Sequence, residues 1–358
     1  MTFPWKLVRI TQERTNPVRS WIPLALVFGF CGARAAASFD RSDELFGSGP
    51  PLGAWVRTNV WAVFALLALP LLLGRAAGIA RRFQRADSEW LAPCPLSPWV
   101  VELALLAGIG SGALLLVALA AGAAEISCPT APGLRFVGRT SVPPAVLPEG
   151  AAPFSFVLEA PPPAGFPSGA RIRVSPMVAP GSGPAVSVRA SLSDAEGGST
   201  SVEKRIHGRA TLEIPLPRGG AGPLGFTLER SGPGAVLVFP DRSVDILVET
   251  SSDRWASLEL GLRAWLALAA WMALAAGLGA WMRPTLATLL SLAGVAHAGL
   301  LELARAFLPG GDLRGAWDLV GQGIVPPPLS PALLVPHAGG VLVGLLLLHF
   351  GLRARRSP

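Results

Sequence analysis

The histidines and cysteines are the first residues to consider as metal ligands or nucleophiles, and their spacing favours neither role. The three cysteines fall in separate predicted elements, so we expect structural roles and no disulfide framework; they are Cys31, Cys94 and Cys128. The histidines are equally scattered, without the paired spacing of metal ligands; they are His207, His297, His337 and His349. We therefore expect no metal site.

Two further patterns bear on ligand chemistry. Asp194 and Glu196 lie beside two glycines, and we interpret this acidic segment as a solvated turn rather than a cation site. No glycine-rich loop ending in Gly-Lys-Ser/Thr occurs in the chain, which excludes ATP hydrolysis by a P-loop of its own. We expect this chain to bind no cofactor.

Ionisable residues inside apolar segments are functional candidates, because a charge is costly in a bilayer. Two acid–base pairs have helical spacing and should neutralise each other: Glu259 with Arg263, and Glu302 with Arg305. The remaining candidates for a transport pathway are Glu102 and His297. A position at the membrane interface explains Glu102 almost as well.

The elements that must position these residues are six long apolar segments. The chain is 51% hydrophobic and only 15% charged, and a bilayer core requires about 20 mostly apolar residues per helix. The predicted spans are Trp21–Phe39, Trp55–Ile79, Trp99–Ala124, Leu260–Met282, Thr285–Leu308 and Leu333–Leu352. The first is marginal, and a cleaved signal peptide is the alternative for it, because small residues follow its apolar stretch.

Charge distribution predicts the topology of these spans. Basic residues gather before the first span, after the second, after the fourth and after the sixth, whereas the segment from Glu125 to Arg254 holds twelve basic and twelve acidic residues. The positive-inside rule then places both termini in the cytoplasm and the neutral segment outside. This pattern, and not nucleic-acid binding, accounts for the net charge of +7. Arginine far outnumbers lysine, which suggests a GC-rich bacterium and hence its cytoplasmic (inner) membrane.

Three further regions complete the predicted organisation. Residues 1–20 resemble an interfacial cytoplasmic helix, and residues 312–325 a short amphipathic helix at the outer surface. Residues 125–256 form an extracytoplasmic domain, periplasmic or extracellular, between the membrane regions 21–124 and 257–358. Seven short alternating segments within it predict a β-sandwich: 154–159, 170–175, 185–193, 210–214, 225–230, 235–239 and 243–250. Alternation in Arg171–Val174 predicts one buried face and one solvated face.

The cytoplasmic loop over residues 80–98 carries the most specific pattern in the chain. It combines basic, acidic and Pro-Leu-Ser elements; its candidate site residues are Arg81, Arg82, Arg85, Asp87, Glu89, Leu91, Pro95, Leu96 and Ser97. It resembles the loop between the second and third spans of type 2 ATP-binding-cassette (ABC) transporter permeases, where Glu-Leu-Leu and Thr-Pro-Leu-Ser help to form the surface that docks on the ATPase. The usual Glu-Arg-Glu-x-Gly-Thr stretch is replaced here by residues 82–87, so the acidic coupling residues are missing or displaced.

This resemblance implies an α-helical membrane protein of six transmembrane helices that acts as a permease subunit of an exporter. Its implied partners are an ABC ATPase chain, which uses ATP, and a second permease subunit in a homodimer or heterodimer within the lipid bilayer. The inserted β-sandwich lies outside the resemblance. The alternative is a non-transporting membrane protein whose β-domain binds a cell-surface polymer or partner protein. An intramembrane enzyme ranks last, because the spans lack a concentrated set of polar residues.

Overall fold

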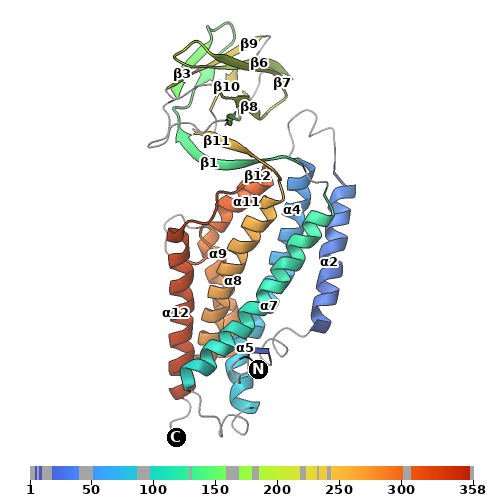
Figure 1. Ribbon diagram of the computed structural model, residues 1–358, viewed down its shortest axis with the longest axis vertical. Helices are drawn as coiled ribbons and strands as arrows, with labels where there is room; N and C mark the ends of the chain where they lie inside the picture. The colour runs from blue at the N-terminus through green and yellow to red at the C-terminus, as the bar shows by residue number, and fades with distance from the viewer. Residues whose placement is uncertain are drawn as a thin grey trace.

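The computed structural model describes residues 5, 8–9, 18–39, 51–86, 97–128, 131–158, 169–179, 185–217, 223–231, 234–239, 243–300 and 308–354. Figure 1 shows two parts, a bundle of long helices and a group of β-sheets at one end of it. We call this the sheet end of the bundle and the other the distal end. Helices α5 (Leu69–Ala86), α8 (Trp255–Trp281) and α12 (Pro331–Ala354) end at the distal end, and α7 (Pro98–Ile126) and α9 (Pro284–Leu300) begin there.

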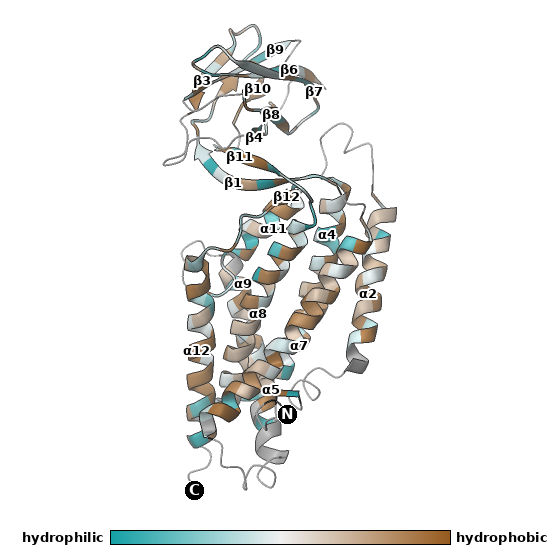
Figure 2. Cartoon of the chain, in the orientation of Figure 1, coloured by the Kyte–Doolittle hydropathy of each residue, from teal (hydrophilic) through white to brown (hydrophobic). Residues whose placement is uncertain are grey.

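Helices lie in the described parts of all six segments predicted to be apolar spans. Their bounds are α2 (Val18–Ala37), α4 (Leu52–Val63) continued by η1 (Phe64–Ala68) and α5 (Leu69–Ala86), α7 (Pro98–Ile126), α8 (Trp255–Trp281), α9 (Pro284–Leu300) and α12 (Pro331–Ala354). Four of the stretches are long and apolar enough to cross a membrane: Leu52–Ile79, Trp99–Ile126, Trp255–Trp281 and Pro331–Ala354. The apolar helices Trp21–Ala37 and Pro284–Ala298 are shorter. Apolar residues cover these helices in Figure 2, as expected of a membrane-embedded bundle.

The second long helix contains a π-helical segment, η1, between α4 and α5. The amide of Leu69 bonds the carbonyl of Phe64, five residues back. Pro70 follows directly, and a proline ring clashes with the carbonyl four residues earlier in a regular α-helix. The wider π-turn relieves this clash, and such bulges often lie at functional sites.

Helix α8 is the central helix and packs against α5, α7, α9, α11 (Leu313–Gly321) and α12. Small residues bring it close to its neighbours. A Cβ on Gly344 of α12 would lie 2.4 Å from the carbonyl carbon of Ala273, and one on Gly279 of α8 would lie 1.9 Å from the carbonyl oxygen of Ala77. Close backbone approach at small residues is the usual basis of helix association in membranes, so these glycines set the bundle's geometry.

The inserted region between α7 and α8 forms three separate β-sheets. The five-stranded sheet A has the order β12-β1-β11-β4-β8, the three-stranded sheet B the order β2-β10-β5, and the four-stranded sheet C the order β3-β9-β6-β7. The strands are β1 (Gly133–Ser141), β2 (Val146–Leu147), β3 (Phe154–Leu158), β4 (Ala170–Val174), β5 (Met177–Val178), β6 (Val186–Ser193), β7 (Ser199–Ile206), β8 (Leu212–Pro215), β9 (Leu224–Ser231), β10 (Val236–Leu237), β11 (Ser243–Thr250) and β12 (Ile324–Val325).

Side chains from all three sheets share one apolar core, which includes Ile172, Leu192, Phe226 and Val238. Strands lie in all seven predicted segments. The expected alternation is confirmed in β6, where every second residue from Val186 is buried. In β4 the predicted solvated face is wrong at Arg173, which is only 8% exposed. The correction has a tertiary cause, because the segment after α11 (Leu313–Gly321) covers this part of sheet A.

The two parts of the molecule share a strand. β12 follows α11 in the second half of the chain, yet it pairs in parallel with β1 at the edge of sheet A. Buried Leu247 of β11, Leu319 of α11 and Ile324 of β12 form a small apolar cluster at this junction. The sheets are therefore joined to the helical bundle by hydrogen bonds and packing as well as by the two chain connections.

Candidate functional site

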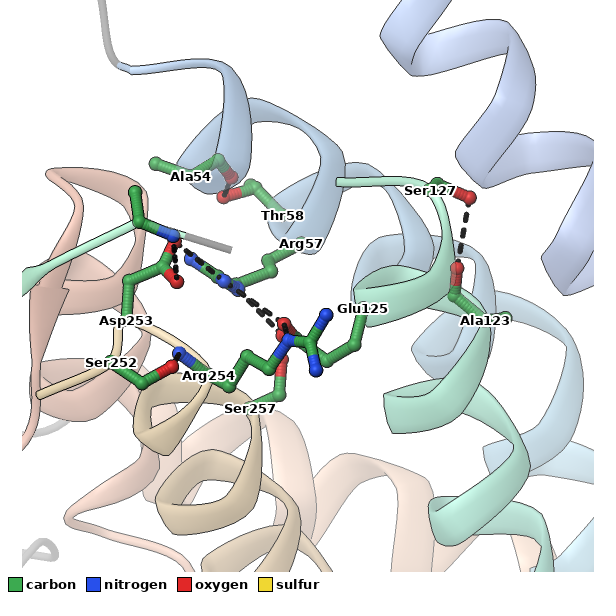
Figure 3. Close-up of polar contacts among 11 residues, drawn as sticks. Ala54, Arg57, Thr58, Ala123, Glu125, Ser127, Ser252, Asp253, Arg254 and Ser257 are labelled. Atoms are coloured by element: carbon green, nitrogen blue, oxygen red, sulfur yellow. Dashed lines mark hydrogen bonds and ion pairs between the residues drawn. The ribbon is translucent and has the colours of Figure 1, made fainter. Parts of the chain in front are cut away.

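An ionic cluster lies at the sheet end of the bundle, centred on Arg57 of α4 (Figure 3). Arg57 Nε donates to Glu125 Oε1 at 2.7 Å, and its Nη2 donates to Glu125 Oε2 at 3.1 Å and to Asp253 Oδ2 at 2.9 Å. Arg57 is 1% exposed. A planar guanidinium can bond two carboxylates at once, and such charge-assisted bonds are among the strongest in proteins.

The partners of Arg57 stand at the two ends of the inserted β region. Glu125 lies in the last turn of α7, just before the insert, and Asp253 lies just before α8, just after it. Asp253 also accepts a hydrogen bond from the amide of Ala131, at 3.3 Å, while its own amide donates to the carbonyl of Ala131. The hydroxyl of Ser257 in α8 donates to Glu125. The cluster thus fixes α4, α7, α8 and both connections to the sheets at one point.

Arg57 was missed in the sequence analysis. The available signal was an arginine within a predicted span, which is rare unless it is paired or functional. Cys128 lies beside this cluster, and burial raises the pKa of its thiol to about 11, so the thiol is protonated and inert at neutral pH. Cys31 and Cys128 are both free.

A second buried cluster links α8 to α11. Arg263 pairs with Glu259 one helical turn away, at 3.3 Å, as its spacing predicts. Its Nε also donates to Asp312 at 3.0 Å, and its Nη2 donates to the carbonyl of Pro327 at 2.6 Å. Arg263 therefore does more than neutralise Glu259. It also holds the segment from Asp312 to Pro327, which contains α11, at both of its ends. The other predicted pair, Glu302 with Arg305, lies outside the described residues.

Glu102 is buried near the distal end of the bundle and pairs with His349 of α12. The distance from His349 Nδ1 to Glu102 Oε2 is 2.9 Å. Glu102 is 2% exposed and His349 is 3% exposed. The ring of Trp99 stacks on the imidazole, with centroids 3.9 Å apart. Glu102 thus links α7 to α12 through its contact with His349. The sequence analysis treated His349 as an isolated histidine because 247 residues separate the pair.

His297, the other pathway candidate, lies on the outer surface of α9, where its Nδ1 is 2.8 Å from the carbonyl of Ala293 in the same helix. It stands in the last turn of α9, whereas Glu102 stands in the first turns of α7. α7 and α9 both begin at the distal end (Figure 1), so His297, 13 residues into α9, lies farther from that end than Glu102, four residues into α7. The structure does not bring them together.

The predicted coupling loop begins and ends within described helices at the distal end. Arg81 is half-buried in α5, and its Nη2 donates to the carbonyl of Met282 at 3.3 Å, so it joins α5 to the end of α8. Arg82 and Arg85 lie in the last turns of α5. Ser97 is the exposed residue that precedes α7. The other predicted loop residues, Asp87, Glu89, Leu91, Pro95 and Leu96, lie outside the described residues.

Two cavities lie beside α11 and share Trp317 as a lining residue. An apolar cavity of about 270 Å³ extends into the bundle, beside the π-helical segment and α8; its aromatic lining residues are Trp61, Phe64, Trp271 and Trp317. A polar cavity of about 490 Å³ lies between α11 and sheet A. Trp317 of α11 therefore borders both an apolar and a polar cavity.

No family model, curated protein or solved structure matches the chain. The resemblance to type 2 ABC permeases consequently rests on the residues between Arg81 and Ser97 and on the arrangement of apolar segments.

Proposed function

We propose that this chain is the membrane-spanning permease subunit of an ABC-type exporter, which uses the ATP hydrolysis of a separate ATPase chain to move a substrate outward. In this proposal all six apolar helices cross the cytoplasmic membrane of a bacterium, both termini are cytoplasmic, and the three sheets form an extracytoplasmic β-sandwich. A second permease subunit, identical or different, completes the pathway.

The observation that supports the proposal most directly is the residue pattern of the segment between Arg81 and Ser97. It combines the Glu89, Leu91 and Pro95–Ser97 elements of a permease coupling loop with a position between the distal ends of α5 and α7. The sheets lie at the opposite end of the bundle (Figure 1). An ATPase bound at the distal end would face this segment without contacting the β insert.

Helix α7 supplies a direct mechanical connection from this segment to the insert. Its 29 residues run from Pro98 to Ile126, which at 1.5 Å per residue is about 43 Å of continuous helix. Glu102 ties the first part of α7 to α12, and Glu125 ties its last turn to Arg57. In the proposed mechanism, ATPase closure displaces the coupling loop, and α7 transmits the displacement to α12 and to the β insert.

The outward faces of the bundle suit contact with lipid and with a second subunit. Large apolar side chains are exposed on α2, α9 and α12, among them Phe30 at 70%, Leu289 at 63% and Val335 at 68%. In the proposed transporter, one six-helix subunit does not enclose an aqueous pathway by itself. One of these exposed apolar faces therefore contacts the second permease subunit.

The alternative function is ligand binding by the β insert without transport, and the polar cavity at sheet A favours it. In that case the insert would be an independent module with a helical anchor. The pairing of β12 with β1 and the Arg57 cluster instead integrate the insert with the helices. This integration supports coupled movement over simple anchorage.

The proposal is tested by purification of the chain from its native membrane, where it predicts that an ABC ATPase copurifies. The variant R82E/R85E/E89K reverses the charge of the loop and should abolish the association. R353E is the matched control, because Arg353 is an exposed arginine of α12 at the same end of the bundle. The melting temperatures of both variants in detergent verify folding. A stable complex with the loop variant would rule out the coupling-loop assignment.

A further inference from the structure

The polar cavity beneath sheet A is built on a row of alternating charges. Arg139 of β1, Asp245 of β11, Arg173 of β4 and Glu213 of β8 are successive partners in the register of four neighbouring strands. Because side chains alternate across a sheet, the residues next to them in sequence, such as Ile172, point into the apolar core. The charged row lies on the other face, toward α11.

The acceptors of this row are already occupied by its own arginines. Arg139 bonds both oxygens of Asp245, with Nε–Oδ1 and Nη2–Oδ2 distances of 2.6 and 3.2 Å. Arg173 donates through Nη2 to Glu213 and through Nη1 to the carbonyl of Gln322, at 3.4 Å. Each carboxylate of the row is therefore paired with an arginine of the row.

Arg173 provides the observation that points to a ligand. It lines the cavity and is more than nine-tenths buried, and its Nε has no hydrogen-bond partner and no exposure to solvent. A buried N–H of a cation without an acceptor is unfavourable and rare in folded proteins.

Two more arginines converge on the same cavity. Arg139 and Arg209 line it together with Arg173, and the indole of Trp317 borders it from α11. Asp318 also lines it and, like Arg209, is exposed, so water screens the charges of both residues. Guanidinium groups match the planar oxygen pairs of carboxylates and phosphates better than any other side chain.

We propose that this cavity binds an oxyanion, a phosphate or carboxylate group that belongs to a larger molecule, through Arg173, Arg209 and Arg139. The volume of about 490 Å³ is in the range of pockets for organic ligands and exceeds the space of a bare ion. A lipid head group and a soluble phosphorylated or carboxylated compound share this chemistry. The site requires no ATPase partner and is independent of the proposed transport function.

Titration of the full-length protein with inorganic pyrophosphate in a neutral detergent tests the site, with melting temperature and tryptophan fluorescence as readouts. The main variant is R209Q, because Arg209 is exposed and its loss should not affect folding. R173Q/E213Q is the second variant, in which the paired carboxylate is neutralised together with the arginine. R189Q is the matched control, because Arg189 is an exposed arginine of β6.

A second arm uses nanodiscs of phosphatidylcholine with or without phosphatidylglycerol. We expect saturable pyrophosphate binding, or stabilisation by phosphatidylglycerol, that R209Q weakens about tenfold through loss of one charge-assisted contact. R189Q should behave as the unmodified protein. A response only to phosphatidylglycerol identifies a lipid head group, and a response to pyrophosphate identifies a soluble ligand. Absence of both responses, or equal responses in the unmodified protein and both cavity variants, overturns the proposal.

Discussion

Replacement of Arg57 by methionine should destabilise the joint between the β insert and the helical bundle. The variant R57M removes three hydrogen bonds to carboxylates, at 2.7, 3.1 and 2.9 Å. Methionine retains most of the side-chain volume, so the change isolates the charge. Glu125 and Asp253 then remain partly buried without their shared cation.

The magnitude follows from what each carboxylate retains. Breaking a buried ion pair by removal of one partner costs about 3–5 kcal/mol. Glu125 keeps the hydroxyl of Ser257, and Asp253 keeps the amide of Ala131, so we expect the lower end of the range, about 3 kcal/mol. Neutralising both acids in R57M/E125Q/D253N should restore more than half of this loss, because no unpaired charge is left.

Chemical unfolding in detergent, followed by tryptophan fluorescence, measures these differences. The matched control is R254M, since Arg254 approaches the same Glu125 at 3.9 Å but has a 55% exposed side chain; such exposed pairs contribute about 0–1 kcal/mol. If R57M and R254M lose the same stability, or if the triple variant is less stable than R57M, the cluster does not hold the joint as argued.

Two further predictions concern helix packing and pH dependence. G344A should lower the free energy of unfolding by about 1–3 kcal/mol through overpacking against α8. G339A on the same helix should not lower it, because a Cβ at Gly339 meets no atom within 4 Å. Equal effects of the two variants would contradict the close α8–α12 contact. Burial raises the pKa of Cys128 from 9.0 to about 11, so the folded state retains a proton that the unfolded state loses, and stability should fall as pH rises from 9.0 to about 11. C128A should lack this component of the pH dependence in unfolding titrations, and an unchanged slope would contradict it.

The apolar segments and most strands could be predicted because their signals are local. A helix across a bilayer needs a long apolar run, and a half-buried strand needs alternation, so each is readable from consecutive residues. Strand β7 was missed because only Ile206 at its end is fully buried. β12 was missed because two residues carry no periodicity, and the expected helix over 312–325 ends at Gly321 in the structure.

The candidate site residues could be predicted only in part. Glu102 was recognised from its position in an apolar segment, but its partner His349 was not, since pairing depends on how α7 and α12 pack. Arg57 bonds residues 68 and 196 positions away in sequence. The partner of each charged side chain is set by contacts between distant segments. The spacing of residues along the chain does not predict these contacts.

The apolar segments of the sequence were enough to predict a membrane-embedded protein in which a β-rich insert separates two groups of apolar helices. The resemblance of residues 81–97 to a permease coupling loop stays a prediction. Only the tertiary structure decided that Arg57 joins both ends of the insert and that sheet A takes a strand from beyond α11. It also decided that Arg173 is buried beside a polar cavity. The apolar and alternating patterns that predict helices and strands lie in consecutive residues, so the sequence shows them directly. Which side chains are buried or form ion pairs depends on contacts between segments that are far apart in the sequence.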